Sequence, residues 1–231
     1  MTSVANGIRV AIDGPSGSGK SSVSKKVAAH LGIGYLDTGA MYRALTWYCL
    51  DRGIDLDDQG AVADAVTAMP LEMGTDPSAP SISMGGTRID TDIRTTRIAE
   101  VVSKVATNLQ VRPKLQQRQR ELIAQIAAHQ GGVVAEGRDI TTVVAPDADV
   151  RILMVASEAA RLARRSKELH GGADDAAIAA TRTQIVDRDK ADSTVSSFMS
   201  AADGVVTLDT SDLTFQQSVE AVLTLVERAR G

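Results

Sequence analysis

The sequence predicts an α/β fold, a parallel sheet with helices on both faces. Apolar, β-branched segments of strand length alternate with amphipathic helical segments along the chain, and this alternation is typical of parallel sheets. A glycine-rich loop joins the first predicted strand to the first predicted helix. The 231 residues are 43% hydrophobic, which is enough to bury a substantial core.

The glycine-rich loop is Gly14-Pro15-Ser16-Gly17-Ser18-Gly19-Lys20-Ser21, which matches G-x-x-x-x-G-K-[ST]. A buried strand over residues 8–12 precedes it, and a helix over residues 22–31 follows. This context predicts the P-loop NTPase fold and a nucleoside triphosphate in the loop. We expect Lys20 to reach the β- and γ-phosphates and the Ser21 hydroxyl to ligate Mg²⁺. The predicted ATP-binding residues are Gly14, Pro15, Ser16, Gly17, Ser18, Gly19, Lys20, Ser21 and Ser22.

Composition excludes several other classes of protein. The net charge of −4 gives no basic field, which argues against nucleic acid as a partner. No apolar run is long enough to cross a membrane, and residues 1–7 lack the pattern of a signal peptide. Cys49 is the only cysteine, so we expect a cytoplasmic protein without an intrachain disulfide. We also expect a monomer.

The first helix leads to a short strand over residues 34–37 and a second helix over residues 39–52. Thr38 is the predicted cap of this helix. Tyr42 and Arg43 lie on its first turns, near the strand ends where ligands bind in open α/β sheets. Arg43 is therefore a candidate anion contact.

The next part of the chain has a different character. A helix over residues 57–69 precedes a stretch, residues 71–93, that is rich in glycine and proline and has short alternating segments. The pair Gly85-Gly86 predicts a hairpin turn, so this stretch is a small β-rich insert. Two further helices follow, over residues 94–105 and 112–129.

A second apolar strand over residues 133–136 ends in an acidic residue, Glu136. That is the position of a Walker B residue, which can hold Mg²⁺ through water. Arg138 and Asp139 follow in the same loop and offer one bidentate anion binder and one acceptor.

A strand over residues 150–156 leads to a helix over residues 158–169, capped by Ser157. Arg161, Arg164 and Arg165 share one face of that helix. A second helix over residues 174–189 completes a predicted lid over the nucleotide. The last two elements are a strand over residues 205–208 and a helix over residues 214–228, with Phe215, Val219, Val222, Leu223 and Val226 facing inward.

Four groups of motifs resemble bacterial cytidylate kinase from about Val10 to the C-terminus. They are Leu36-Asp37-Thr38-Gly39-Ala40-Met41-Tyr42-Arg43; Ile93-Arg94 with Ser103 and Arg112; Glu136-Gly137-Arg138-Asp139 with Thr142-Val143-Val144-Ala145-Pro146-Asp147-Ala148; and Arg188-Asp189-Lys190-Ala191-Asp192-Ser193. The resemblance implies the nucleoside monophosphate kinase fold. The expected core is residues 1–43, 106–156 and 190–231, the monophosphate-binding insert residues 44–105, and the lid residues 157–189.

The resemblance also implies a reaction, transfer of the γ-phosphoryl group of ATP to CMP or dCMP with Mg²⁺ bound to the ATP. Asp139 and Ser103 resemble the acceptors for the cytosine N4 amino group, and Arg112 the donor to the ring. The remaining implied roles are the CMP phosphate for Arg43 and Arg138, the ribose for Arg188 and Asp192, and the transferring phosphoryl group for Arg161 and Arg165. Thr38, Tyr42 and Gly137 complete the substrate pocket, and the implied catalytic residues are Lys20, Arg138, Arg161 and Arg165.

One position departs from the family pattern. Where the family has an arginine after Thr194, this chain has Val195, and the following stretch is about two residues shorter. That arginine touches the acceptor phosphate in the family. We therefore expect weaker CMP binding, or compensation by a lid arginine such as Arg164.

Two alternatives remain open at this point. One is another small P-loop kinase with a different acceptor, although a purine or uracil acceptor has no use for Asp139 beside Arg112. The other is a nucleotide-dependent binding switch, because Asp57-Asp58-Gln59-Gly60 matches D-x-x-G. That stretch follows no buried strand, however, and the sequence has no N-K-x-D guanine motif.

Overall fold

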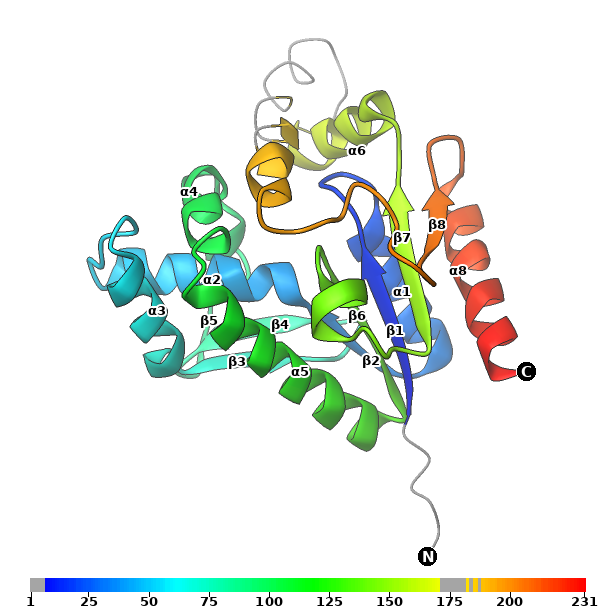
Figure 1. Ribbon diagram of the computed structural model, residues 1–231, viewed down its shortest axis with the longest axis horizontal. Helices are drawn as coiled ribbons and strands as arrows, with labels where there is room; N and C mark the ends of the chain where they lie inside the picture. The colour runs from blue at the N-terminus through cyan, green and yellow to red at the C-terminus, as the bar shows by residue number, and fades with distance from the viewer. Residues whose placement is uncertain (1–6, 171–181, 183–184, 187) are drawn as a thin grey trace, which may run out of the picture.

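The computed structural model describes residues 7–170, 182, 185–186 and 188–231 of the chain. Within these residues five strands form a central sheet, and every neighbouring pair is parallel, as predicted. Their order across the sheet is β2 (Gly34–Asp37), β6 (Gly132–Gly137), β1 (Ile8–Asp13), β7 (Val150–Val155) and β8 (Val206–Asp209). Since β1 lies at the centre, the loop after it opens between the ends of β6 and β7 (Figure 1).

Helices cover both faces of this sheet, which confirms the predicted fold class (Figure 1). One face carries α1 (Lys20–Leu31) and α8 (Phe215–Arg230), and the other carries α5 (Val111–Gln130) and a single π-helical turn, η2 (Ile140–Val144). Val10 and Ile12 of β1 pack on the first face, while Ala11 packs on the second. Side chains of β1 thus alternate between two apolar cores, as the pleat of a strand requires.

The cap of α2 (Thr38–Asp51) differs from the prediction. Asp37 is the N-cap residue, because its backbone is extended and its Oδ1 accepts the N–H of Ala40 at 2.9 Å. The Thr38 hydroxyl instead donates to the carbonyl of Glu136 at 2.7 Å. The predicted cap was therefore wrong by one residue, and Thr38 connects α2 to β6.

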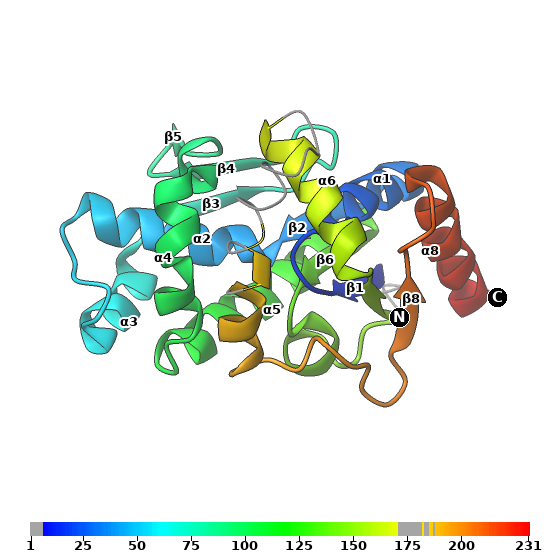
Figure 2. The same ribbon diagram turned by 90° about the horizontal axis from the view of Figure 1, so that it is seen from above.

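The chain between α2 and α5 forms an insert with its own core, at the opposite end of the molecule from α8 (Figure 2). It contains α3 (Gln59–Ala68), β3 (Leu71–Gly74), β4 (Ser81–Met84), β5 (Thr87–Arg88), the 3₁₀ turn η1 (Asp92–Arg94) and α4 (Thr96–Ala106). The three strands form a separate antiparallel sheet. Gly85 and Gly86 both have positive φ, 58° and 80°, so the predicted hairpin turn is confirmed. The helix expected from Arg94 begins at Thr96 instead, because η1 precedes it.

The chain after β7 starts with α6 (Glu158–His170), whose predicted cap is confirmed by the N–H of Ala160, which donates to the Ser157 hydroxyl. Much of the second predicted lid helix, over residues 174–189, lies outside the described residues, although 188–193 are helical. The last helix, α8, is capped by Thr214. Phe215 is 51% exposed, so its predicted inward orientation was wrong.

Candidate active site

The loop between β1 and α1 has a backbone that only glycine can follow at two points. A Cβ atom on Gly14 would lie 2.2 Å from the carbonyl oxygen of Met154, and one on Gly17 would lie 2.7 Å from that of Arg161. Gly17 also has φ of 76°, a region that side chains disfavour. The first N–H groups of α1 have no partner within the helix and face the same loop, which makes it an anion site.

Lys20 supplies the positive charge of this loop. Its Nζ lies 3.3 Å from the carbonyl oxygen of Pro15. Burial lowers the pKa of Lys20, although the nearby Glu136 carboxylate opposes that change. An ammonium in such surroundings gains from a further anion, so a phosphate group in the loop would keep Lys20 charged.

Glu136 lies at the carboxyl end of β6, directly opposite Asp37 of β2 in the parallel register. Its Oε1 accepts the hydroxyl of Tyr35 at 2.7 Å, and Ser21 lies beside it. Burial raises the pKa of Glu136, and the charge of Asp37 raises it further, while Lys20, Ser21 and Tyr35 act in the opposite direction. The carboxylates of the buried Glu136 and the partly buried Asp37 thus lie side by side, and this favours a cation between them.

The donors at this place fit Mg²⁺, which prefers carboxylate, hydroxyl and water oxygens. Within the described residues, no group of three histidine, cysteine or acidic side chains gathers as a metal site. A Mg²⁺ ion at the predicted ligands Ser21 and Glu136 would therefore take its other ligands from water and from the phosphates of a nucleotide. The sequence analysis predicted Ser21 and Glu136 as ligands but not Asp37, whose carboxylate lies next to Glu136.

A cavity of about 710 Å³ extends from this loop toward α5, a volume suited to a nucleotide-sized ligand. Residues 16–22 of the loop, Arg164 and the start of α8 line one end, which we call the loop end. Tyr42, Arg112, Asp139 and Ser196 line the other end, which we call the α5 end. The two ends offer different binding groups: the loop end offers mainly backbone N–H groups, and the α5 end mainly polar side chains. They can therefore hold two different ligands.

At the α5 end the structure brings Asp139 and Arg112 together. The Nη2 of Arg112 donates to Oδ2 of Asp139 at 2.7 Å, and Nε2 of Gln116 donates to the same oxygen at 2.7 Å. Arg112 is fixed further by the Ser196 hydroxyl at 2.8 Å and the Ala106 carbonyl at 3.1 Å. The result is a buried acceptor beside a buried donor, both held rigidly.

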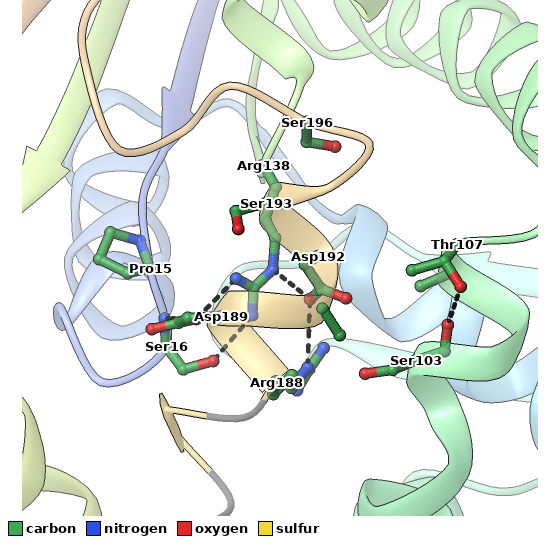
Figure 3. Close-up of polar contacts among 12 residues, drawn as sticks. Pro15, Ser16, Ser103, Thr107, Arg138, Arg188, Asp189, Asp192, Ser193 and Ser196 are labelled. Carbon is green, nitrogen blue, oxygen red and sulfur yellow. Dashed lines mark hydrogen bonds and ion pairs between the residues drawn. The ribbon is translucent and has the colours of Figure 1, made fainter.

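Arg138 lies at the centre of a charged cluster between the two ends (Figure 3). Its Nη1 pairs with Asp189 at 2.9 Å, its Nε with Asp192 at 2.8 Å, and its Nη2 donates to the Ser16 hydroxyl at 2.8 Å. The guanidinium also stacks 4.6 Å above the ring of Phe198. Arg188 lies 3.5 Å from the Asp192 carboxylate. These contacts join the phosphate-binding loop to the chain after residue 188.

Further arginines concentrate positive charge in the cavity. Burial lowers the pKa of Arg43 to about 9, and the charge of Arg188 lowers it further. Burial likewise lowers the pKa of Arg188 to about 10, with a further contribution from Arg138. Both pKa shifts mean that the cavity has too little negative charge for its arginines, and an entering phosphate group would supply it.

Comparison with known proteins gives the family. The family model described as cytidylate kinase matches residues 10–228. A cytidylate kinase of Streptomyces avermitilis is 49% identical, covering 96% of this chain and 94% of the relative. Those of Streptomyces coelicolor (47% identical, 98% of this chain and 96% of the relative) and Rhodococcus opacus (43%, 96% of each) are similar over the same length.

The chain belongs to the cytidylate kinase family. The resemblance that four motifs indicated is therefore confirmed. Family membership does not favour a nucleotide-dependent switch, and Asp57-Asp58-Gln59-Gly60 lies at the start of α3 in the insert, away from the cavity lining. Among the described residues, no helix combines the length and the apolar character needed to cross a bilayer.

The three arginines of α6 lie in different surroundings. Arg161 is buried, ion-paired with Asp189 and hydrogen-bonded to the carbonyl of Ser16 at 2.9 Å. Arg164 donates to the Ser18 carbonyl at 3.2 Å and to the Thr210 hydroxyl at 3.0 Å, so it lies at the loop end and not beside Val195. Arg165 lines the cavity.

Ser103, a predicted base contact, is not among the residues that line the cavity, whereas Tyr42, a predicted substrate contact, is. The Ser103 side chain points from α4 toward Arg188 and Asp192 (Figure 3), while its neighbours along the helix, Ala99 and Ala106, line the cavity. The Tyr42 side chain is buried. Burial raises the pKa of Tyr42, and the charge of Asp139 raises it further.

The sequence analysis missed two residues of this site, Gln116 and Asp189. Gln116 lies four residues after Arg112 on α5, on the same helical face, and that spacing could have identified it. Asp189 stands inside the quoted motif Arg188-Asp189-Lys190. Its contact with the loop joins residues 173 positions apart, which no local pattern indicates.

Proposed function

We propose that this chain transfers the γ-phosphoryl group of ATP to CMP or dCMP, giving CDP or dCDP and ADP. The observation that carries the proposal is the buried Asp139–Arg112 pair, which shares one cavity with the phosphate-binding loop. A nucleobase with an amino group beside ring acceptors complements this pair, and cytosine is such a base. Family membership supports the same reaction.

ATP binds with its β- and γ-phosphates against the loop N–H groups and Lys20. Ser21 and, through water, Glu136 would hold Mg²⁺, which when bound would neutralise phosphate charge. Phe215, half-exposed on the cavity wall at the loop end, offers an aromatic face to the purine. The loop thereby fixes the γ-phosphorus toward the α5 end.

CMP binds at the α5 end. Its N4 amino group donates to Asp139 and to the Ser103 hydroxyl, while Arg112 donates to the ring. Uracil would turn a carbonyl oxygen toward the Asp139 carboxylate and leave buried groups unpaired, which such sites reject by up to about 10⁴-fold. Thr38, Tyr42 and Gly137 line the pocket around the nucleoside.

Arginines hold the phosphates of both substrates. Arg43 and Arg138 contact the CMP phosphate, and Arg188 with Asp192 contacts the ribose. Of the five N–H groups of Arg138, one on each terminal nitrogen remains after its contacts to Asp189, Asp192 and Ser16. Arg161 and Arg165 cover the transferring group.

In the reaction, an oxygen of the CMP phosphate bonds to the γ-phosphorus as the bond to the bridging oxygen of ADP breaks. Positioning and charge neutralisation by Lys20 and the arginines account for catalysis, so no general base is assigned. Closure of a lid over residues 157–189 excludes water, which would otherwise hydrolyse ATP. Residues 44–105 form the monophosphate-binding insert, and residues 1–43, 106–156 and 190–231 the core.

The proposal includes a cytoplasmic monomer. One chain supplies residues at both ends of the cavity, so the site needs no second copy. The only cysteine, Cys49, is buried, and burial raises the pKa of its thiol to about 11. An inert buried thiol is compatible with a reducing compartment.

The test is ADP release from Mg-ATP with CMP, dCMP, UMP, AMP and GMP in parallel. Turnover restricted to CMP and dCMP is the expected result. Comparable turnover with UMP would keep the kinase but contradict the role of Asp139. Turnover with only AMP or GMP would make the chain a kinase with a different acceptor, and ATP binding without turnover would contradict the proposal.

A further inference from the structure

Gln116 is a buried polar residue that the proposed reaction does not use. It lies on α5, one helical turn beyond Arg112, and is 9% exposed. Its Nε2 donates to Oδ2 of Asp139 at 2.7 Å. Its amide therefore serves a carboxylate of the candidate site and no backbone group of its own helix.

Only one of the two oxygens of the Asp139 carboxylate, Oδ2, accepts hydrogen bonds from the described residues. Oδ2 accepts both Arg112 and Gln116, whereas Oδ1 has no hydrogen-bond partner within the described residues. Two donors on one oxygen fix the plane of the carboxylate, and the other oxygen then points at a defined place. The two donors differ in kind: Arg112 brings a charge, and Gln116 brings a neutral N–H.

The charge of Asp139 decides which base it can accept. An ionised carboxylate only accepts hydrogen bonds and complements the N4 amino group of cytosine, whereas a protonated one would donate to the O4 carbonyl of uracil. Asp139 is 5% exposed, so its carboxylate depends on hydrogen-bond donors of the protein and little on water. The N–H of Gln116 is one of these donors, and it adds no second cation to the pocket.

We propose that Gln116 is a positioning residue for acceptor specificity: with Arg112 it holds Oδ2 of Asp139, so that Oδ1 is left to accept from an exocyclic amino group. This inference rests on the proposed function, because it concerns the same acceptor site. Gln116 touches neither the base nor the reacting phosphates and acts through Asp139 alone.

The neighbouring Gln117 provides a matched control. It is exposed, and its Nε2 donates to Glu121 at 2.8 Å on the outer face of α5. Gln117→Met makes the same chemical change in the same helix without touching Asp139. Gln116→Met keeps the length of the side chain and removes the donor, and Gln116→Glu keeps the shape and replaces the donor with an acceptor.

The experiment measures kcat and KM for CMP, UMP and ATP in the wild type and the three variants, after thermal melting has verified folding. A hydrogen bond to a charged group corresponds to about 10- to 100-fold, so we expect the KM for CMP to rise by that factor in Gln116→Met. We expect kcat with CMP and the KM for ATP to change less than about threefold. The ratio of kcat/KM for CMP to that for UMP should fall about tenfold or more in both Gln116 variants, and stay unchanged in Gln117→Met.

Two results would overturn the inference while the wild type remains active with CMP. One is a CMP/UMP ratio equal to that of the wild type in both Gln116 variants. The other is an equal loss with CMP and UMP, which identifies a merely structural role. If Gln116→Met does not fold, Gln116→Glu decides by the same ratio. A wild type inactive with CMP would overturn the proposed function itself, and the inference with it.

Discussion

The carboxylate of Asp189 accepts the backbone N–H of Ser16 inside the phosphate-binding loop, with 3.0 Å between nitrogen and Oδ1. The same carboxylate pairs with Arg138 and Arg161. One acidic side chain thus connects the loop, the end of β6 and α6. It is 6% exposed, so its charge is balanced by these arginines and not by water.

Removal of this carboxylate is expected to destabilise the whole core. Asp189→Ala removes the carboxylate partner of the buried Arg161 and one of the two carboxylates paired with Arg138, and the loss of one member of a buried pair costs about 3 kcal/mol or more. The free energy of unfolding in urea measures this. Asp212→Ala, at an exposed aspartate, is the control and should change it by less than about 0.5 kcal/mol. Equal stability of the two variants would exclude the connecting role of Asp189.

Replacement of Lys20 tests the donor side of the proposed reaction. Lys20→Ala removes the ammonium group of the phosphate-binding loop, so we expect kcat with CMP to fall by about 10³-fold while the melting temperature stays within a few degrees. Lys26→Ala, on the exposed face of α1, should retain normal turnover. Near-normal turnover of Lys20→Ala would refute its assigned contact with the transferring phosphate.

Much of this fold is predictable because its signals are local. The loop, the alternation of strands and helices, and the turn at Gly85-Gly86 each depend on neighbouring residues, and all three predictions are confirmed. The errors concern termini of helices. At Asp37 and Thr38 two adjacent residues can both cap, and the choice depends on a carbonyl of Glu136, about a hundred positions away in the sequence.

The residues of the candidate site likewise fall into two groups, those that a local motif predicts and those that only tertiary packing brings together. Lys20 and Ser21 follow from one contiguous motif, whereas the partners of Asp139 come from α5 and those of Arg138 from the chain after residue 188. Such pairs depend on tertiary packing that a single sequence does not encode locally. The resemblance to a family supplied Arg112 but not Gln116, because the resemblance carries only residues that belong to the shared motifs.

Asp13 gives the protein a characteristic dependence of stability on pH. It is buried at the end of β1, where its carboxylate accepts the N–H groups of Ile140 and Thr141 and the Thr141 hydroxyl. Burial raises the pKa of Asp13 from 3.8 to about 6, against the effect of these hydrogen bonds. The native state therefore binds this proton more tightly than the unfolded state does.

The sign follows from linkage. The stabilisation from protonated Asp13 is complete below pH 4 and is lost as the pH rises through about 6. Between pH 4.5 and 7 this amounts to about 2 kcal/mol of unfolding free energy. Asp13→Asn should lose that part of the pH dependence, measured by urea unfolding at both pH values. An identical slope in variant and wild type would mean that Asp13 has an ordinary pKa.

Val195 occupies the position where the family resemblance implies an arginine that contacts the acceptor phosphate. Val195 lies three residues after Asp192, which pairs with Arg138. The next residue is Ser196, whose hydroxyl accepts a hydrogen bond from Arg112. Arg164, the residue expected to compensate, is hydrogen-bonded at Ser18 and Thr210 instead. In the proposed site the acceptor phosphate therefore depends on Arg43 and Arg138, and the further arginine that the family resemblance implies is absent.

Val195→Arg is thus expected to strengthen the hold on the acceptor phosphate. One added charge-assisted hydrogen bond to phosphate corresponds to about a tenfold lower KM for CMP. The KM for ATP should not change, because the loop end is untouched. Val195→Gln, with a long polar side chain but no charge, separates charge from size. If Val195→Arg and Val195→Gln have the same KM for CMP as the wild type, the arginines already present complete the clamp.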